Sequence, residues 1–132
     1  MVIDTSAIIA ILLDEPERAV FVEAIATDST RLMSASTLLE CHLVIESRKQ
    51  ALGRAELELF TYEAEIDVVP FDQVQATLAA TAWRAYGKGR HSAGLNFGDC
   101  FAYALAKALE EPLLFKGNDF SQTDIVRVSV AA

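Results

Sequence analysis

Short apolar runs alternate with longer amphipathic segments along most of this chain of 132 residues. The runs are almost entirely apolar, which is typical of strands in a parallel sheet that is covered on both faces. Segments with apolar residues three or four positions apart, the spacing of a helix, lie between them. This alternation predicts an α/β fold, a three-layer sandwich in which a mostly parallel central sheet of about five short strands is flanked by helices. The predicted strands are residues 1–4, 31–34, 67–71, 112–115 and 125–130.

Six helical segments are expected to connect and cover these strands. Two of them lie on either side of Gly53 and are expected to form a hairpin. Asp72 is a good N-terminal cap for the next helix, in which the spacing places Trp83 toward the core. The predicted helices are a segment from residue 5 and the segments 16–28, 36–50, 54–65, 72–86 and 95–109.

The length of the chain predicts a single domain over residues 1–132, because two ordinary domains need more residues. Cys41 and Cys100 each lie in an apolar helical pattern and are expected to be buried thiols. The longest unbroken apolar run, Ala7 to Leu13, is far shorter than the ~20 residues that cross a bilayer. No basic and apolar leader opens the chain, so we expect a cytoplasmic protein with no membrane segment.

Four acidic residues follow a predicted strand or open the next helix. Each has an ordinary structural explanation when it is taken alone. Asp4 can cap a helix, and Glu40 stands three residues after Thr37, the spacing of a capping box. Asp99 can be a first-turn acid, and Asp119 lies in a stretch with ordinary turn chemistry.

Taken together, the four acids share a position that capping does not require. They converge on the carboxyl edge of the predicted sheet, where α/β folds bind their ligands. Two like charges ~4 Å apart repel by about 4 kcal/mol, so a carboxylate cluster needs cations or protons. Ligands that are all oxygen favour Mg²⁺ or Mn²⁺. The cluster therefore predicts metal-assisted phosphoryl chemistry with metal-activated water.

Charge is unevenly distributed along the chain. The formal net charge of -8 argues against simple electrostatic binding of nucleic acid. No acid occurs between Gln73 and Gly98, however, and this stretch carries Arg84, Lys88 and Arg90. These three residues form a local basic patch and are candidate contacts to phosphates.

Four segments together resemble the PIN-domain nucleases, and specifically the VapC toxins of toxin–antitoxin pairs. They are Met1 to Ala7, Ser36 to Glu40, Asn96 to Cys100 and Asn118 to Phe120. The resemblance covers essentially the whole chain, and the order and spacing of the segments agree as well. It implies a PIN-like fold and a Mg²⁺- or Mn²⁺-dependent endoribonuclease, whose cleft a cognate VapB-type antitoxin fills.

By matching positions, the resemblance implies that Asp4, Glu40, Asp99 and Asp119 form the catalytic, metal-binding quartet. Asp4 and Asp99 are expected closest to the main ion, and Glu40 is expected to bind it directly or through water and to orient the attacking water. Asp119, and with less support Asp124, would hold a second ion.

Two further positions bear on this site. Ser6 is a secondary candidate that could hydrogen-bond a carboxylate or a phosphate oxygen. Many relatives carry Thr and Asp where this chain has Phe115 and Gly117, which weakens the expected second metal site.

Two functions remain open on the sequence. The first is hydrolysis of RNA to fragments with 5′ phosphates and 3′ hydroxyls, as the toxin of a type II toxin–antitoxin pair. The second is a non-catalytic PIN-like module that binds RNA or a protein, which the presence of all four acids disfavours. A hydrophobic content of 52% also predicts that part of the surface is covered, by a second copy in a homodimer or by the antitoxin.

Overall fold

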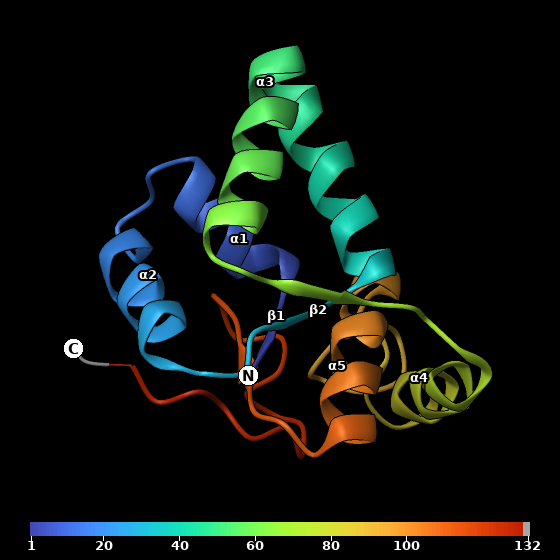
Figure 1. Cartoon of the computed structure of the whole chain (residues 1–132). Helices are drawn as coiled ribbons and strands as arrows, with labels where there is room; N and C mark the ends of the chain where they lie inside the picture. The colour runs from blue at the N-terminus through green and yellow to red at the C-terminus, as the bar shows by residue number, and fades with distance from the viewer. Residues whose placement is uncertain (131–132) are drawn as a thin grey trace.

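The structure is a computed structural model that describes residues 1–130. Its sheet has four strands in the order β3-β2-β1-β4, and every neighbouring pair is parallel. The carboxyl ends of all four strands therefore face the same edge (Figure 1). The predicted α/β fold is confirmed. The strands are β1 (Val2–Ile3), β2 (Leu32–Ser34), β3 (Asp67–Val69) and β4 (Leu113–Leu114).

The prediction of a fifth strand at residues 125–130 is wrong. This segment forms one isolated parallel bridge, in which Arg127 pairs with Leu113. The Leu113 N–H donates to the Val126 carbonyl (2.9 Å), and the Val128 N–H donates to the Leu113 carbonyl (3.0 Å). Because β4 itself is only two residues long, its outer edge is too short for a ladder.

Helices cover both faces of the sheet. Side chains alternate between the faces of a strand, and β1 and β4 follow this rule. Ile3 and Leu114 join the core under α1, α2 and α3, whereas Val2 and Leu113 join the core under α4 and α5. The sheet therefore lies between two helical layers, as predicted (Figure 1). The helices are α1 (Thr5–Leu12), α2 (Arg18–Thr27), α3 (Ala35–Glu63), α4 (Gln73–Tyr86) and α5 (Phe97–Leu109).

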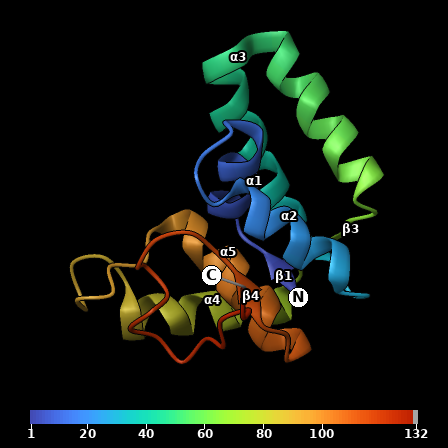
Figure 2. The same ribbon diagram turned by 90° about the vertical axis from the view of Figure 1, so that its left-hand side faces the viewer.

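The long element α3 is the predicted hairpin of two helices. The chain reverses at Gln50, whose φ of 52° and ψ of -133° are not helical, and the two arms project from the molecule (Figure 2). Gly53 lets the arms approach, since a Cβ at this position would lie 2.6 Å from the Ile45 carbonyl oxygen. The Lys49 ammonium ties the hairpin together by pairing with Glu56 at 2.9 Å.

Trp83 lies differently from what helical spacing predicts. Trp83 is 45% exposed, and the Arg90 guanidinium stacks over its ring at 4.6 Å. Phe97, the first residue of α5, is 80% exposed, and its ring packs edge-on against that of Phe101 with the ring centroids 4.8 Å apart. Cys41 and Cys100 are buried free thiols, as expected. Among residues 1–130, no helix is long and apolar enough to cross a bilayer.

Candidate active site

Asp4 is both a helix cap and a member of the acidic cluster. It directly follows β1 and is the N-cap of α1. Its Oδ2 accepts hydrogen bonds from the Ser6 backbone N–H (3.0 Å) and the Ser6 hydroxyl (2.6 Å). The side chain is only 4% exposed. Capping therefore fixes this carboxylate at the carboxyl end of β1, one of the two inner strands of the sheet.

Glu40 does not act as a cap, because α3 begins at Ala35 with Ser34 as its N-cap. Glu40 lies six residues beyond that cap, and Thr37 is buried inside the helix, so the capping-box interpretation is wrong. The Glu40 carboxylate instead accepts a hydrogen bond from the Thr5 hydroxyl at the start of α1. This contact brings Glu40 next to Asp4.

Asp99 opens α5 in a reciprocal capping box with Asn96. The Asn96 N–H donates to Asp99 Oδ2 (3.0 Å), and the Asp99 N–H donates to Asn96 Oδ1 (2.9 Å). The preceding residue, Gly98, lies directly against the Glu40 carboxylate, because a Cβ there would be 2.6 Å from Glu40 Cδ. The beginnings of α1 and α5 therefore meet Glu40 on α3.

The pKa values of the aspartates show that the acids interact. Burial raises the pKa of Asp4 to about 6, partly offset by the Ser6 hydrogen bonds, and the charge of Glu40 raises it further. Burial likewise raises the pKa of Asp99 to about 7, and the charges of Asp4 and Asp119 add to this shift. Asp119 itself is exposed on the loop after β4. The four predicted acids thus form one electrostatic cluster.

The donor set of this cluster fits a divalent cation that prefers oxygen, such as Mg²⁺ or Mn²⁺. Clustered carboxylates with raised pKa values lack a compensating positive charge, which an ion would supply. Within residues 1–130, however, no three Asp, Glu, His or Cys side chains already stand in a metal-binding arrangement.

Ser6 links Asp4 to the loop that carries Asp119. Its hydroxyl donates to Asp4 and accepts from the Lys116 backbone N–H at 2.9 Å. The Lys116 ammonium in turn pairs with Glu15 at 2.9 Å and with Glu17 at 3.2 Å. Sequence reasoning selected Ser6 and missed Lys116, because no local pattern signals a backbone contact across 110 residues.

Asp124 lies outside the cluster. Its Oδ1 accepts a hydrogen bond from the Tyr103 hydroxyl (2.5 Å), and its Oδ2 pairs with the Lys107 ammonium (2.8 Å). Both partners are on α5, one and two turns beyond Asp99. These contacts anchor the C-terminal segment, and we therefore leave Asp124 out of the proposed metal site.

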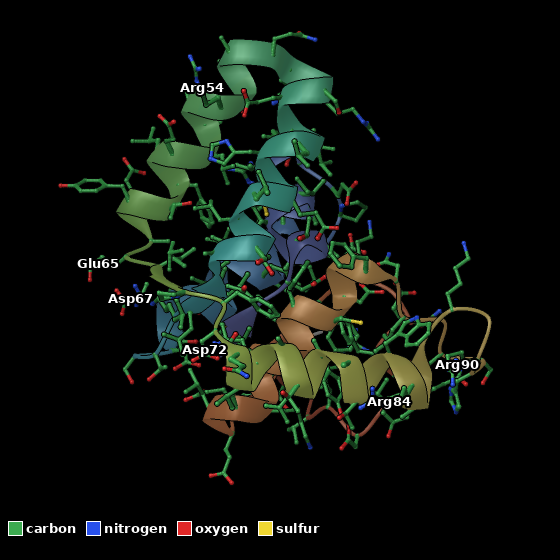
Figure 3. The ribbon with its side chains drawn as sticks, turned by 90° about the vertical axis from the view of Figure 1, so that its right-hand side faces the viewer. Arg54, Glu65, Asp67, Asp72, Arg84 and Arg90 are labelled. Carbon is green, nitrogen blue, oxygen red and sulfur yellow. The ribbon has the colours of Figure 1, made fainter. Side chains whose placement is uncertain are left out.

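The three basic candidates lie at the end of α4 and in the loop that follows it. Figure 3 shows two of them, Arg84 and Arg90. Arg84, Lys88 and Arg90 are all exposed. Trp83, which Arg90 covers, and Phe97 both line an apolar groove of about 480 Å³ between α4 and α5. In the chain, Phe97 is two residues before Asp99.

A parallel sheet between helical layers, with acids gathered at its carboxyl edge, defines the class of α/β domains to which the PIN domain belongs. The PIN domain model matches residues 1–126. Ribonuclease VapC30 of Mycobacterium tuberculosis is 52% identical over 130 residues, which cover 98% of this chain and 99% of that protein. The chain therefore belongs to the PIN-domain family and, within it, to the VapC ribonucleases of toxin–antitoxin systems.

Solved structures share the fold at lower sequence identity. The crystal structure of Mycobacterium tuberculosis VapC20, a toxin that cleaves the sarcin–ricin loop, superposes with a TM-score of 0.74 at 19% identity. It covers 96% of this chain and 97% of its own. The VapBC2 complex of Rickettsia felis, bound to a DNA fragment from its promoter, gives a TM-score of 0.77 at 13% identity and covers 97% and 96%.

Proposed function

We propose that this chain is an endoribonuclease that depends on Mg²⁺ or Mn²⁺ and hydrolyses RNA to fragments with 5′ phosphates and 3′ hydroxyls. The observation that carries this proposal is the position of Glu40. Its carboxylate is not used by its own helix and is held instead by the Thr5 hydroxyl, beside Asp4 and close to the start of α5. A capping role cannot explain that arrangement.

Each acid has a distinct part in this proposal. Asp4, which caps α1, and Asp99, which the capping box with Asn96 orients, would bind the main ion. Glu40 would bind this ion directly or through a water molecule and orient the attacking water, and the exposed Asp119 would support a second ion. Once bound, the ion supplies a lowered pKa for water and stabilises negative charge on the phosphate.

Metal removal tests this function directly. We expect the purified chain to cut total cellular RNA at discrete positions in Mg²⁺ or Mn²⁺ and to leave it intact in excess EDTA. Adding Mn²⁺ in excess of the chelator should restore cleavage, and sequencing the ends should reveal 5′ phosphates. RNA that stays intact under every metal condition, with no antitoxin co-purified, would favour the non-catalytic binding module instead.

Partners are proposed from the family and from the surface. A VapB-type antitoxin would fill the cleft, and a homodimer or the antitoxin would cover exposed apolar side chains. The α3 hairpin carries five such side chains, which are Leu39, Leu43, Leu52, Leu59 and Tyr62. We place the activity in the cytoplasm, because the protein would meet both cellular RNA and the antitoxin in that compartment.

The basic patch is proposed to hold RNA phosphates. Replacing Arg84, Lys88 and Arg90 together by Gln should weaken RNA binding and reduce the slope of log affinity against log salt by about 2, since each phosphate contact to a single strand contributes about 0.7. Binding would be measured by fluorescence anisotropy in an Asp4→Asn background, so that RNA is not cut.

The control is a pair of arginines at the tip of the hairpin. Arg48 and Arg54 are also exposed and basic, and Arg54 lies far from Arg84 and Arg90 (Figure 3). Their replacement by Gln should leave the salt slope nearly unchanged. If the slope of log affinity against log salt did not change in the triple variant, the three basic residues would be part of an ordinary solvated surface.

A further inference from the structure

Glu40 is contacted from two sides by residues that directly neighbour the two capped aspartates. Thr5 follows Asp4 at the start of α1, and Gly98 precedes Asp99 at the start of α5. We propose that Thr5 and Gly98 are positioning residues that together fix the Glu40 carboxylate within the acidic cluster, an inference that rests on the proposed function. Neither residue is required to bind an ion or RNA itself.

The Thr5 hydroxyl is not needed to cap its own helix, and besides Glu40 it contacts the buried Cys41 thiol. Asp4 already caps α1, so the Thr5 side chain is not needed to satisfy the first backbone N–H groups. Its hydroxyl donates to Glu40 Oε1 across 35 residues of sequence. A glutamate has three rotatable side-chain bonds, and this hydrogen bond selects one orientation of its carboxylate from many. The other oxygen, Oε2, then lies nearest to Gly98.

Gly98 is explained by the same carboxylate. A Cβ at this position would be 2.6 Å from Glu40 Cδ and 2.7 Å from Glu40 Oε1, closer than real Cβ atoms approach other atoms. Its backbone does not require glycine, because its φ is not positive, unlike that of Gly89, Gly94 and Gly117. Alanine is also the better helix former. The missing side chain therefore serves the close approach of Glu40.

The two contacts have a shared geometrical effect. Thr5 sets where Glu40 lies relative to Asp4, and Gly98 sets where it lies relative to Asp99, because each is bonded to that aspartate in the chain. The Glu40 side chain on α3 thus fixes the positions of the starts of α1 and α5 relative to each other. Losing either contact should displace Glu40 without removing any acid.

Four substitutions test this arrangement. Thr5→Val removes the hydroxyl and keeps the shape, Thr5→Ser keeps the hydroxyl, and Gly98→Ala adds the conflicting methyl group. Thr61→Val is the matched control, because Thr61 is also a half-buried helical threonine but its hydroxyl donates only to the Leu57 carbonyl (2.8 Å). Mn²⁺ affinity is measured by calorimetry without RNA, and cleavage rate and melting temperature are measured alongside.

Thr5→Val and Gly98→Ala are expected to weaken Mn²⁺ binding and to slow cleavage by about 10- to 100-fold, the usual effect of removing a partner that orients a metal ligand. Their melting temperatures should stay within a few degrees of that of the parent chain. Thr5→Ser should retain nearly full Mn²⁺ affinity, and Thr61→Val should match the parent chain in every measurement.

Two results would overturn the proposal and leave the nuclease function standing. In the first, Glu40→Gln loses Mn²⁺ affinity while Thr5→Val and Gly98→Ala keep it. In the second, Thr5→Ser is as impaired as Thr5→Val, which would assign the effect of Thr5 to packing. A parent chain that neither binds Mn²⁺ nor cleaves RNA would instead defeat the proposed function, and this inference with it.

Discussion

Asp4→Asn is expected to lower RNA cleavage at least ~1,000-fold, a loss of about 4 kcal/mol of transition-state stabilisation. Asparagine lacks the negative charge that an ion requires at this position. It is nevertheless among the best N-cap residues, so it can still accept the Ser6 backbone N–H and begin α1. The variant should therefore fold like the parent chain and lose only its RNA cleavage activity. Cleavage rates at saturating Mn²⁺, with circular dichroism to verify folding, measure this effect.

Asp72→Asn is the matched control for this prediction. Asp72 is also a helix N-cap, and its carboxylate accepts the Gln75 N–H at 2.9 Å. It lies at the start of α4 and does not contribute to the raised pKa values of Asp4 and Asp99. We expect it to cleave RNA at the parent rate. If Asp4→Asn also retained that rate, Asp4 would have no role in catalysis.

Asp99→Asn should stabilise the protein above neutral pH in the absence of metal. The pKa of Asp99 is about 7 in the folded chain, against an ordinary value of 3.8, so the folded state binds its proton more tightly than the unfolded state. Stability from this group is therefore full at low pH and is lost as the pH rises through about 7. Asparagine removes the cost of burying the charge and can still accept the Asn96 N–H.

We expect a gain of about 2 kcal/mol at pH 8, because each pKa unit corresponds to about 1.4 kcal/mol and the loss of a charged first-turn cap offsets part of the total. The gain should nearly vanish at pH 4, where Asp99 is already protonated in the folded chain. Thermal unfolding in EDTA at both pH values measures it. A variant that is equally or less stable than the parent chain at pH 8 would show that the Asp99 charge carries no such cost.

A stabilising substitution at a proposed catalytic residue has a simple physical meaning. The buried charge of Asp99 and its neighbours Asp4 and Asp119 costs folding free energy when no cation compensates it. Residues kept for function at the expense of stability are expected to behave in this way. The opposite changes in activity and stability would together distinguish Asp99 from an ordinary helix-capping acid.

The parts of this site that are local in sequence could be predicted from the sequence. Asp4 directly follows a strand, and Asp99 stands three residues after the cap residue Asn96, so local spacing predicts both capping contacts. The parallel sheet followed from the alternation of apolar runs and helical spacing, since parallel strands need helical crossovers. The hairpin around Gly53 followed from the same spacing.

The remaining parts depend on contacts between distant residues, which no local pattern encodes. The tertiary structure decided that Glu40 faces Thr5 and Gly98, that Lys116 holds Ser6, and that Asp124 pairs away from the cluster. It also decided that residues 125–130 make one bridge in place of a strand. Sequence determined the helices and the four strands of the sheet, and it determined where the two acids in capping motifs, Asp4 and Asp99, stand. Tertiary packing alone determined which side chains from other elements contact these acids. Such contacts depend on how the separate helices are rotated and spaced around the sheet.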